Sequence, residues 1–149
     1  MPIFDKAHAD MVIALVDDDP DDRFIIKRTL NLMPQRLAAV EYENGQLCLD
    51  DFNKQIGSGD QPAEMIILDL NMPIMNGQEF LKKFRSDARF TGVPIVVLTT
   101  ADDDETHQRA RDLGANQCMS KCSDWQGRGL LSQLIIDYWM VAKQRVVAV

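Results

Sequence analysis

Cysteine is scarce in this sequence, and its three copies do not form a pattern that stabilises a fold. Cys48, Cys118 and Cys122 make an odd number at uneven spacing, which argues against the disulfide framework of a small secreted protein. Cys118 and Cys122 form a C-x3-C arrangement, but the second pair of ligands that zinc requires is missing. We expect three reduced, partly buried thiols.

Basic residues and long apolar runs are also in short supply. Lys and Arg number 16 against 23 Asp and Glu, and the net charge of −7 disfavours nonspecific binding to nucleic acid or to anionic membranes. An acidic balance instead suits a protein that holds a divalent cation. The longest apolar runs, such as Met11–Val16, have about six residues, whereas a membrane span needs about 20. Because that run is too short for a secretory signal, and Asp5 and Asp10 precede it in place of a basic n-region, no such signal is expected, and the expected location is the cytoplasm.

Length and composition predict one globular domain. The chain has 149 residues, of which 46% are hydrophobic and 26% charged. Gly57-Ser58-Gly59 is interpreted as a loop and not as a domain linker, because the same alternation of segments continues beyond it. We therefore expect residues 1–149 to form a single domain with short tails, its core covering about 11–142.

Short apolar runs alternate with longer amphipathic segments along the chain. The expected strands are Met11–Val16, Leu37–Tyr42, Met65–Leu68, Pro94–Leu98 and Gln117–Ser120. The expected helices are Pro20–Leu32, Asn44–Ile56, Asn76–Ser86, Asp102–Leu113 and Arg128–Lys143. Runs that are apolar throughout are typical of strands covered on both faces. Five such repeats predict an α/β fold of the flavodoxin-like type: a doubly wound, five-stranded parallel sheet of strand order 2-1-3-4-5.

Acidic side chains follow two of these strands. Asp17, Asp18 and Asp19 come directly after the first strand, and Asp69 follows the third. In the expected strand order these strands are neighbours, and ligands bind beyond their carboxyl ends. Carboxylates packed so closely raise each other's pKa or require a cation, and Mg²⁺ is the ion that suits them. The alternative, a solvated cap for the following helix, fits Asp19 best.

The other two strand ends carry a hydroxyl and an amine. Thr99 ends the fourth strand and Lys121 follows the fifth. Taken singly, such a threonine is usually a helix cap and such a lysine is usually solvated. Together with the acids they form a set suited to a phosphoryl group, because Lys121 and a metal offset its charge while Thr99 binds one oxygen.

Four segments in this order resemble the receiver domain of two-component response regulators. They are VDDDPDD (16–22), ILDLNMPIMNG (67–77), VVLTTA (96–101) and the lysine after the last strand. The segment Asp69–Gly77 is the most specific of them, and the resemblance covers about residues 11–142. It implies a stand-alone response regulator that signals through protein contacts, and not an enzyme with turnover on a substrate.

The resemblance also implies roles for the matched acids and amide. Asp69 is the phosphoacceptor that attacks the phosphohistidine of a sensor histidine kinase. Asp18 is the principal Mg²⁺ carboxylate, Asp17 acts partly through water, and Asn71 offers its backbone carbonyl to the metal.

The remaining matched residues would act on the phosphoryl group or shape the loop beside it. Thr99 follows the phosphoryl group inward and Lys121 pairs with it. In the loop after the third strand, Pro73 fixes its own φ, and Gly77 is expected to adopt a backbone conformation closed to other residues.

Two positions depart from the family pattern. Most receivers have proline after the lysine, often through a cis bond, but here Cys122 follows Lys121. The aromatic residue that many receivers carry three positions before the lysine is replaced by Cys118, so a switch that uses a ring is not expected. With the long last helix and Tyr138-Trp139, these features resemble the single-domain regulators that partner bacterial phytochromes.

The last helix has a wide apolar arc. Packing against the core accounts for one part of the arc, which comprises Leu131, Leu134, Ile135 and Tyr138. The rest of the arc comprises Ile136, Met140 and Val141. An arc of this width favours a homodimer through the face made by the fourth helix, the fifth strand and the fifth helix.

Two other functions compete with the phosphorylated receiver. An aspartyl-phosphate hydrolase of the haloacid-dehalogenase type would carry D-x-D on the first strand, whereas this chain has Asp69-Leu70-Asn71 on the third and no segment for a cap domain. A degenerate receiver would bind a partner without accepting phosphate, and the Lys121-Cys122 pair is its only support.

Overall fold

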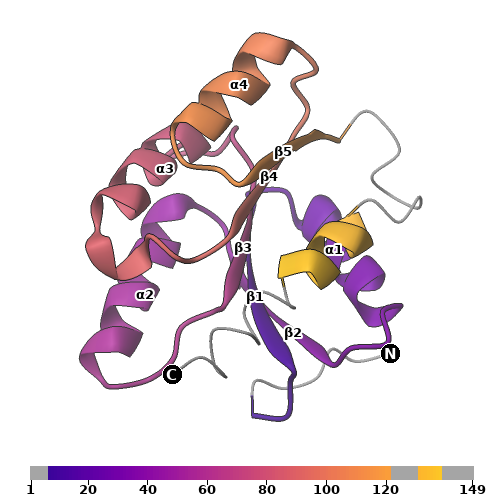
Figure 1. Cartoon of the computed structure of the whole chain (residues 1–149), viewed down its shortest axis with the longest axis vertical. Helices are drawn as coiled ribbons and strands as arrows, with labels where there is room; N and C mark the ends of the chain where they lie inside the picture. The colour runs from indigo at the N-terminus through magenta and orange to yellow at the C-terminus, as the bar shows by residue number, and fades with distance from the viewer. Residues whose placement is uncertain (1–6, 122–130, 139–149) are drawn as a thin grey trace.

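The computed structural model describes residues 7–121 and 131–138. Its centre is a parallel sheet of five strands in the order β2-β1-β3-β4-β5 (Figure 1). The strands are β1 (Met11–Val16), β2 (Leu37–Tyr42), β3 (Met65–Leu68), β4 (Ile95–Thr99) and β5 (Gln117–Ser120). The predicted flavodoxin-like order is therefore confirmed.

The apolar runs determine the strands because both faces of the sheet are covered. Every residue of β1, β3 and β4 is buried, whereas the edge strands β2 and β5 each expose a polar residue, Glu41 and Gln117. Four strands have the predicted bounds. The fourth was predicted one residue too early, because proline has no N–H to donate to the sheet. Pro94 contributes only its carbonyl, which accepts from the N–H of Ile66, and the strand extends to Thr99.

Each helix begins after a polar side chain that caps it. The helices are α1 (Pro20–Asn31), α2 (Gly45–Gly57), α3 (Gly77–Ser86), α4 (Asp104–Asp112) and a short 3-10 turn, η1 (Ala88–Phe90). The caps of the four α-helices are Asp19, Asn44, Asn76 and Asp103, each of which accepts from a backbone N–H of the first turn. Helix α4 starts two residues later than predicted because Asp103 is its cap. Residues 131–138 are helical, and the rest of the predicted segment Arg128–Lys143 lies outside the described residues. No described helix has the length and apolar character of a membrane span.

The helices cover the sheet in two layers, which enclose separate cores. Figure 1 shows α2, α3 and α4 on one face, and α1 with residues 131–138 on the other. The first layer buries a cluster of aromatic rings, with centroids 4.7–5.7 Å apart: Phe52, Phe80, Phe84 and Phe90. The second layer buries Ile26 and Leu30 of α1 against Leu131 and Ile135. Both layers leave the carboxyl ends of the strands open, where the acids lie.

The loop between β3 and α3 differs from the sequence prediction. Gly77 does not have a positive φ; the residue with the left-handed backbone is Ile74, at φ 69°. Glycine is needed at 77 for space, because a Cβ there would lie 2.5 Å from the carbonyl oxygen of Asp69. A β-branched residue in the left-handed region is strained. The strain therefore lies in the loop that directly follows Asp69.

Replacing Ile74 by glycine is expected to stabilise the fold. The left-handed conformation costs isoleucine about 1–2 kcal/mol, and the greater freedom of glycine in the unfolded chain offsets part of that gain. The side chain is 81% exposed, so little burial is lost. We expect the free energy of unfolding to rise by about 1 kcal/mol in urea titration. Ile74→Ala, which removes the branch but keeps a Cβ, is the control. An equal gain from both variants would contradict the strain argument.

Candidate functional site

The pairing of the strands brings the predicted acids together. Val16 of β1 is opposite Leu68 of β3, and the N–H of Asp69 donates to the carbonyl of Val16 at 2.9 Å. Asp17 and Asp69 therefore leave adjacent strands at the same level. The Asp17 backbone carbonyl accepts a hydrogen bond from the Arg23 guanidinium at 2.5 Å. This bond anchors the start of α1 to the end of β1.

Asp17, Asp18 and Asp69 form a compact group of oxygen ligands. One carboxylate oxygen from each lies within 4.8 Å of the others. Asp17 and Asp69 are buried, whereas Asp18 is exposed. Mg²⁺ takes a few carboxylates and keeps several of its waters. Two buried acids with a third at the solvent boundary fit that ion, because the exposed side leaves room for the waters.

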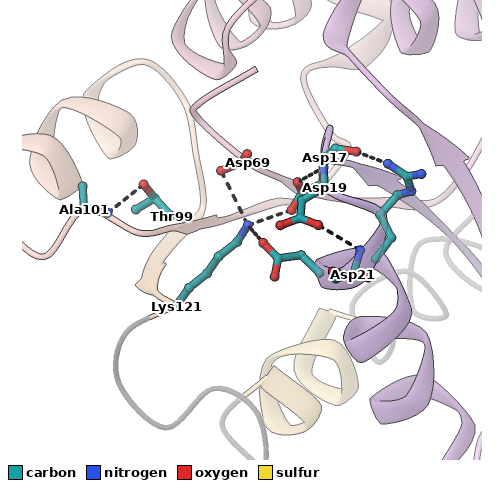
Figure 2. Close-up of polar contacts among 9 residues, drawn as sticks. Asp17, Asp19, Asp21, Asp69, Thr99, Ala101 and Lys121 are labelled. Atoms are coloured by element: carbon teal, nitrogen blue, oxygen red, sulfur yellow. Dashed lines mark hydrogen bonds and ion pairs between the residues drawn. The ribbon is translucent and has the colours of Figure 1, made fainter. Parts of the chain in front are cut away.

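Lys121 reaches the same site from the end of β5. The backbone pairing of Thr99 with Ser120 continues one residue further, where the N–H of Lys121 donates to the carbonyl of Thr99 at 2.7 Å. The Lys121 Nζ lies 2.7 Å from Asp17 Oδ2 and 3.7 Å from Asp69 Oδ1 (Figure 2). A third carboxylate, Asp22 Oδ2 of α1, also lies 2.7 Å from this Nζ.

Burial and crowding set the charges of this group. Burial, and then the charge of Asp17, raise the pKa of Asp69 to about 6. Burial also raises the pKa of Asp17, although its hydrogen bonds with Lys121 and Asp19 act in the opposite direction. Burial alone would lower the pKa of Lys121, but its hydrogen bonds to two carboxylates raise it above the ordinary value. The lysine is thus a positive charge beside two acids, Asp17 and Asp69, whose pKa values burial raises.

A pocket of about 420 Å³ opens over these groups. Its lining comprises Asp18, Asp19, Pro20, Asp22, Asp69, Asn71, Thr100 and Lys121. Asn71 is at the pocket and its backbone N–H bonds to the Asp69 carboxylate. A small anion can reach Asp69 through this opening.

Thr99 lies at the end of β4 and is fully buried. Its hydroxyl accepts from the N–H of Ala101 at 3.1 Å (Figure 2). The carbonyl of Ala101 is in turn 2.9 Å from Nε2 of His107, on α4. A movement of Thr99 would therefore release a backbone N–H in the loop that leads to α4.

The structure thus brings four of the sequence-predicted residues to the lining of one pocket: Asp18, Asp69, Asn71 and Lys121. The buried Asp17 lies within the same group of carboxylates, and Thr99 directly precedes Thr100, which also lines the pocket. The sequence did not identify Asp22, although VDDDPDD contains it, because an acid in the first turn of a helix is ordinarily explained by the helix dipole. Asp19 is the cap of α1, as expected.

The two departures from the family pattern can be followed only in part. Cys118 is buried in β5, and burial raises the pKa of its thiol to about 11. Its position holds no ring, as the sequence indicated. Cys122, Trp139, Met140 and Val141 lie outside the described residues.

Comparison with known proteins agrees with this geometry. The family model "Response regulator receiver domain" matches residues 13–128. The chemotaxis protein CheY1 of Helicobacter pylori is 38% identical over 90 residues, 60% of this chain and 68% of that protein.

Solved structures extend the likeness to nearly the whole chain. The Mn²⁺-bound form of response regulator Rcp1 superposes with a TM-score of 0.69 at 21% identity, covering 90% of each chain. The phosphorylated cyanobacterial phytochrome response regulator RcpA gives a TM-score of 0.68 at 25% identity, covering 88% of this chain and 90% of that one. The family model matches most of the chain, and the acids at the ends of β1 and β3 and the lysine at the end of β5 agree with it. The chain therefore belongs to the receiver domain family of response regulators.

Proposed function

We propose that Asp69 accepts a phosphoryl group from the phosphohistidine of a sensor histidine kinase, with Mg²⁺ as the metal. The observation that carries the proposal is the position of Asp69, which faces an open pocket beside Lys121 and two further carboxylates. Asp17, Asp18 and Asp69 would hold the metal, with the backbone carbonyl of Asn71. When bound, Mg²⁺ offsets the negative charge that gathers around the acceptor.

The transfer needs an ionised nucleophile and donors for the moving group. A carboxylate oxygen of Asp69 attacks the phosphorus, the new O–P bond forms, and the P–N bond to the imidazole breaks with its electron pair on nitrogen. Lys121 pairs with the phosphoryl oxygens, and the Thr99 hydroxyl supplies a further hydrogen bond. Such a reaction depends mainly on position and electrostatics, which rigid strand ends provide. Receiver domains are signalling domains, and no turnover on a free substrate is proposed.

The signal would leave the site through Thr99. If its hydroxyl turns to the phosphoryl group, the N–H of Ala101 loses its acceptor, and the loop that His107 ties to α4 is free to shift. Helix α4 has a single buried residue, Ala110, so a small change at its start can move it. We propose that the face formed by α4, β5 and residues 131–138 is read by a partner or by a second copy in a homodimer.

A bacterial phytochrome is the proposed kinase partner. The likeness to RcpA, a phytochrome response regulator, supports this choice, as do the departures of this chain from the common receiver pattern at Cys118 and Cys122. The same pathway supports a cytoplasmic location for this protein, which is part of the proposal.

Labelling by a small phosphodonor tests the assignment directly. The protein is incubated with acetyl phosphate and Mg²⁺, and its intact mass is measured. We expect one acid-stable, base-labile phosphoryl adduct, which EDTA prevents. Continued release of phosphate from a phosphate ester would favour the hydrolase. A folded protein that takes no label would indicate the binding module.

Magnesium is expected to raise the melting temperature. Binding to the folded state alone stabilises it by about 2.7 kcal/mol at about a hundred times Kd. The gain arises because the ion relieves repulsion between Asp17, Asp18 and Asp69, which is weaker in the unfolded chain. Calorimetry with MgCl₂, compared with KCl of equal ionic strength, measures the shift. Equal shifts with the two salts would contradict a specific site.

A further inference from the structure

Lys121 is held by a carboxylate that has no assigned role in phosphoryl transfer. Its Nζ lies 2.7 Å from Asp22 Oδ2 and 2.7 Å from Asp17 Oδ2, within hydrogen-bond distance of both. The distance to Asp69 Oδ1 is 3.7 Å, which is beyond a hydrogen bond. We propose that Asp22 is a positioning residue that restrains Lys121 away from Asp69 and so limits how tightly the site binds a phosphoryl group. This inference rests on the proposed function.

The restraint is firm because Asp22 belongs to a fixed turn. Pro20 is the first residue of α1, and Asp19 caps the helix by accepting from the N–H of Asp21 at 2.9 Å. The carboxylate of Asp22 therefore projects from a backbone with little freedom. Its side chain is 24% exposed, whereas that of Lys121 is 7% exposed, so the ammonium has few water molecules to replace a lost partner.

Charge makes this restraint act against the phosphoryl group. An ammonium has three N–H donors, and Asp17 and Asp22 receive two of them. If Mg²⁺ binds at Asp17, the attraction of that carboxylate for Lys121 weakens, and Asp22 becomes the strongest partner that competes with the phosphoryl oxygens. Asp22 also repels those oxygens directly. Without its carboxylate, Lys121 would be free to pair with the group on Asp69.

The chain offers a matched control one residue earlier. Asp21 is an exposed acid in the same turn of α1, and its side chain makes no contact with Lys121. Asp21→Asn therefore removes one negative charge near the start of α1, as Asp22→Asn does, but it leaves the ion pairs of Lys121 in place. Asp22→Glu keeps a carboxylate that can still reach the ammonium.

The test titrates beryllofluoride, a non-covalent mimic of the phosphoryl group, into the full chain at saturating Mg²⁺, with calorimetry as the readout. We expect Asp22→Asn to lower the Kd of beryllofluoride about fivefold to tenfold, the order expected for one partly screened charge. The Kd of Mg²⁺ alone should change less than about twofold, because Asp22 is not a proposed metal ligand. Asp21→Asn should leave both constants as in the wild type, and Asp22→Glu should restore the wild-type beryllofluoride Kd.

Each other result would overturn the inference. Weaker binding by Asp22→Asn would mean that Asp22 presents Lys121 to the phosphoryl group. An equal change in Asp21→Asn, or a comparable rise in the Kd of Mg²⁺, would mean that only the general charge of the pocket matters. Thermal melting of each variant shows that it is folded. A wild-type protein that neither binds beryllofluoride nor takes label would instead contradict the proposed function itself.

Discussion

Asparagine in place of Asp69 is expected to abolish labelling by acetyl phosphate and at the same time to stabilise the protein. The amide is not a nucleophile for phosphorus, so the adduct should vanish from the intact mass. The nearest buried acid, Asp17, is not free to replace it, because its carboxylate is held by Lys121 and by the N–H of Asp19 at 2.9 Å. An adduct of normal yield on Asp69→Asn would refute the assignment of the acceptor.

The gain in stability follows from the raised pKa of Asp69. The folded protein keeps this proton up to about pH 6, whereas the unfolded chain releases it near the ordinary value of 3.8. Between these two pH values the folded state binds more protons, so the free energy of unfolding falls as the pH rises, and it stays lower above pH 6. The loss amounts to at most about 3 kcal/mol, from about 1.4 kcal/mol per pKa unit. Asp69→Asn removes this loss.

Urea unfolding at several pH values checks this argument. The free energy of unfolding of Asp69→Asn should exceed that of the wild type least near pH 4, and the difference should reach its full size above pH 6. A gain of the same size at every pH would indicate that the amide acts through packing and not through charge.

The sequence was sufficient to predict which side chains lie together wherever a residue's place follows from the end of a strand. The apolar runs of β1 and β3 fix the register of Val16 with Leu68, and that register alone brings Asp17 beside Asp69. Lys121 follows from β5 in the same way, since its N–H continues the pairing with β4. These placements depend on periodic burial, which a sequence shows directly.

The features that the sequence did not reveal depend on local geometry or on competition between partners. Asp22 meets Lys121 because α1 starts at Pro20, and a shift of one residue in that start would turn the side chain elsewhere. The left-handed conformation of Ile74 was unexpected, because isoleucine disfavours it. The surrounding structure imposes this conformation on Ile74. Gly77, three residues later, is needed for space beside the Asp69 carbonyl and not for a positive φ.

Alanine in place of Gly77 is expected to have the largest structural effect of any single methyl group added near the site. Its Cβ would lie 2.5 Å from the Asp69 carbonyl oxygen and 2.7 Å from the Leu70 Cα. Both are backbone atoms, so neither can turn aside as a flexible side chain would. The N–H of Gly77 also donates to the carbonyl of Leu70 at 2.9 Å, which holds the start of α3 against this segment. The backbone that carries Asp69 must therefore move.

We expect Gly77→Ala to lower the free energy of unfolding by about 3 kcal/mol, the upper end for overpacking. The higher helix propensity of alanine offsets only about 1 kcal/mol of this destabilisation. A displacement of the acceptor of about 1 Å should slow labelling by about a hundredfold, since phosphoryl transfer depends on alignment.

Gly57→Ala is the matched control, because a Cβ at Gly57 meets no atom within 4 Å and φ there is not positive. That variant should gain about 0.5 kcal/mol through lower entropy of the unfolded chain and keep the wild-type labelling rate. Urea titration and timed mass spectra measure both quantities. If Gly77→Ala matched Gly57→Ala in stability, the close approach of α3 to the Asp69 backbone would not exist in solution, and the rigidity that we attribute to the acceptor would have to come from another contact.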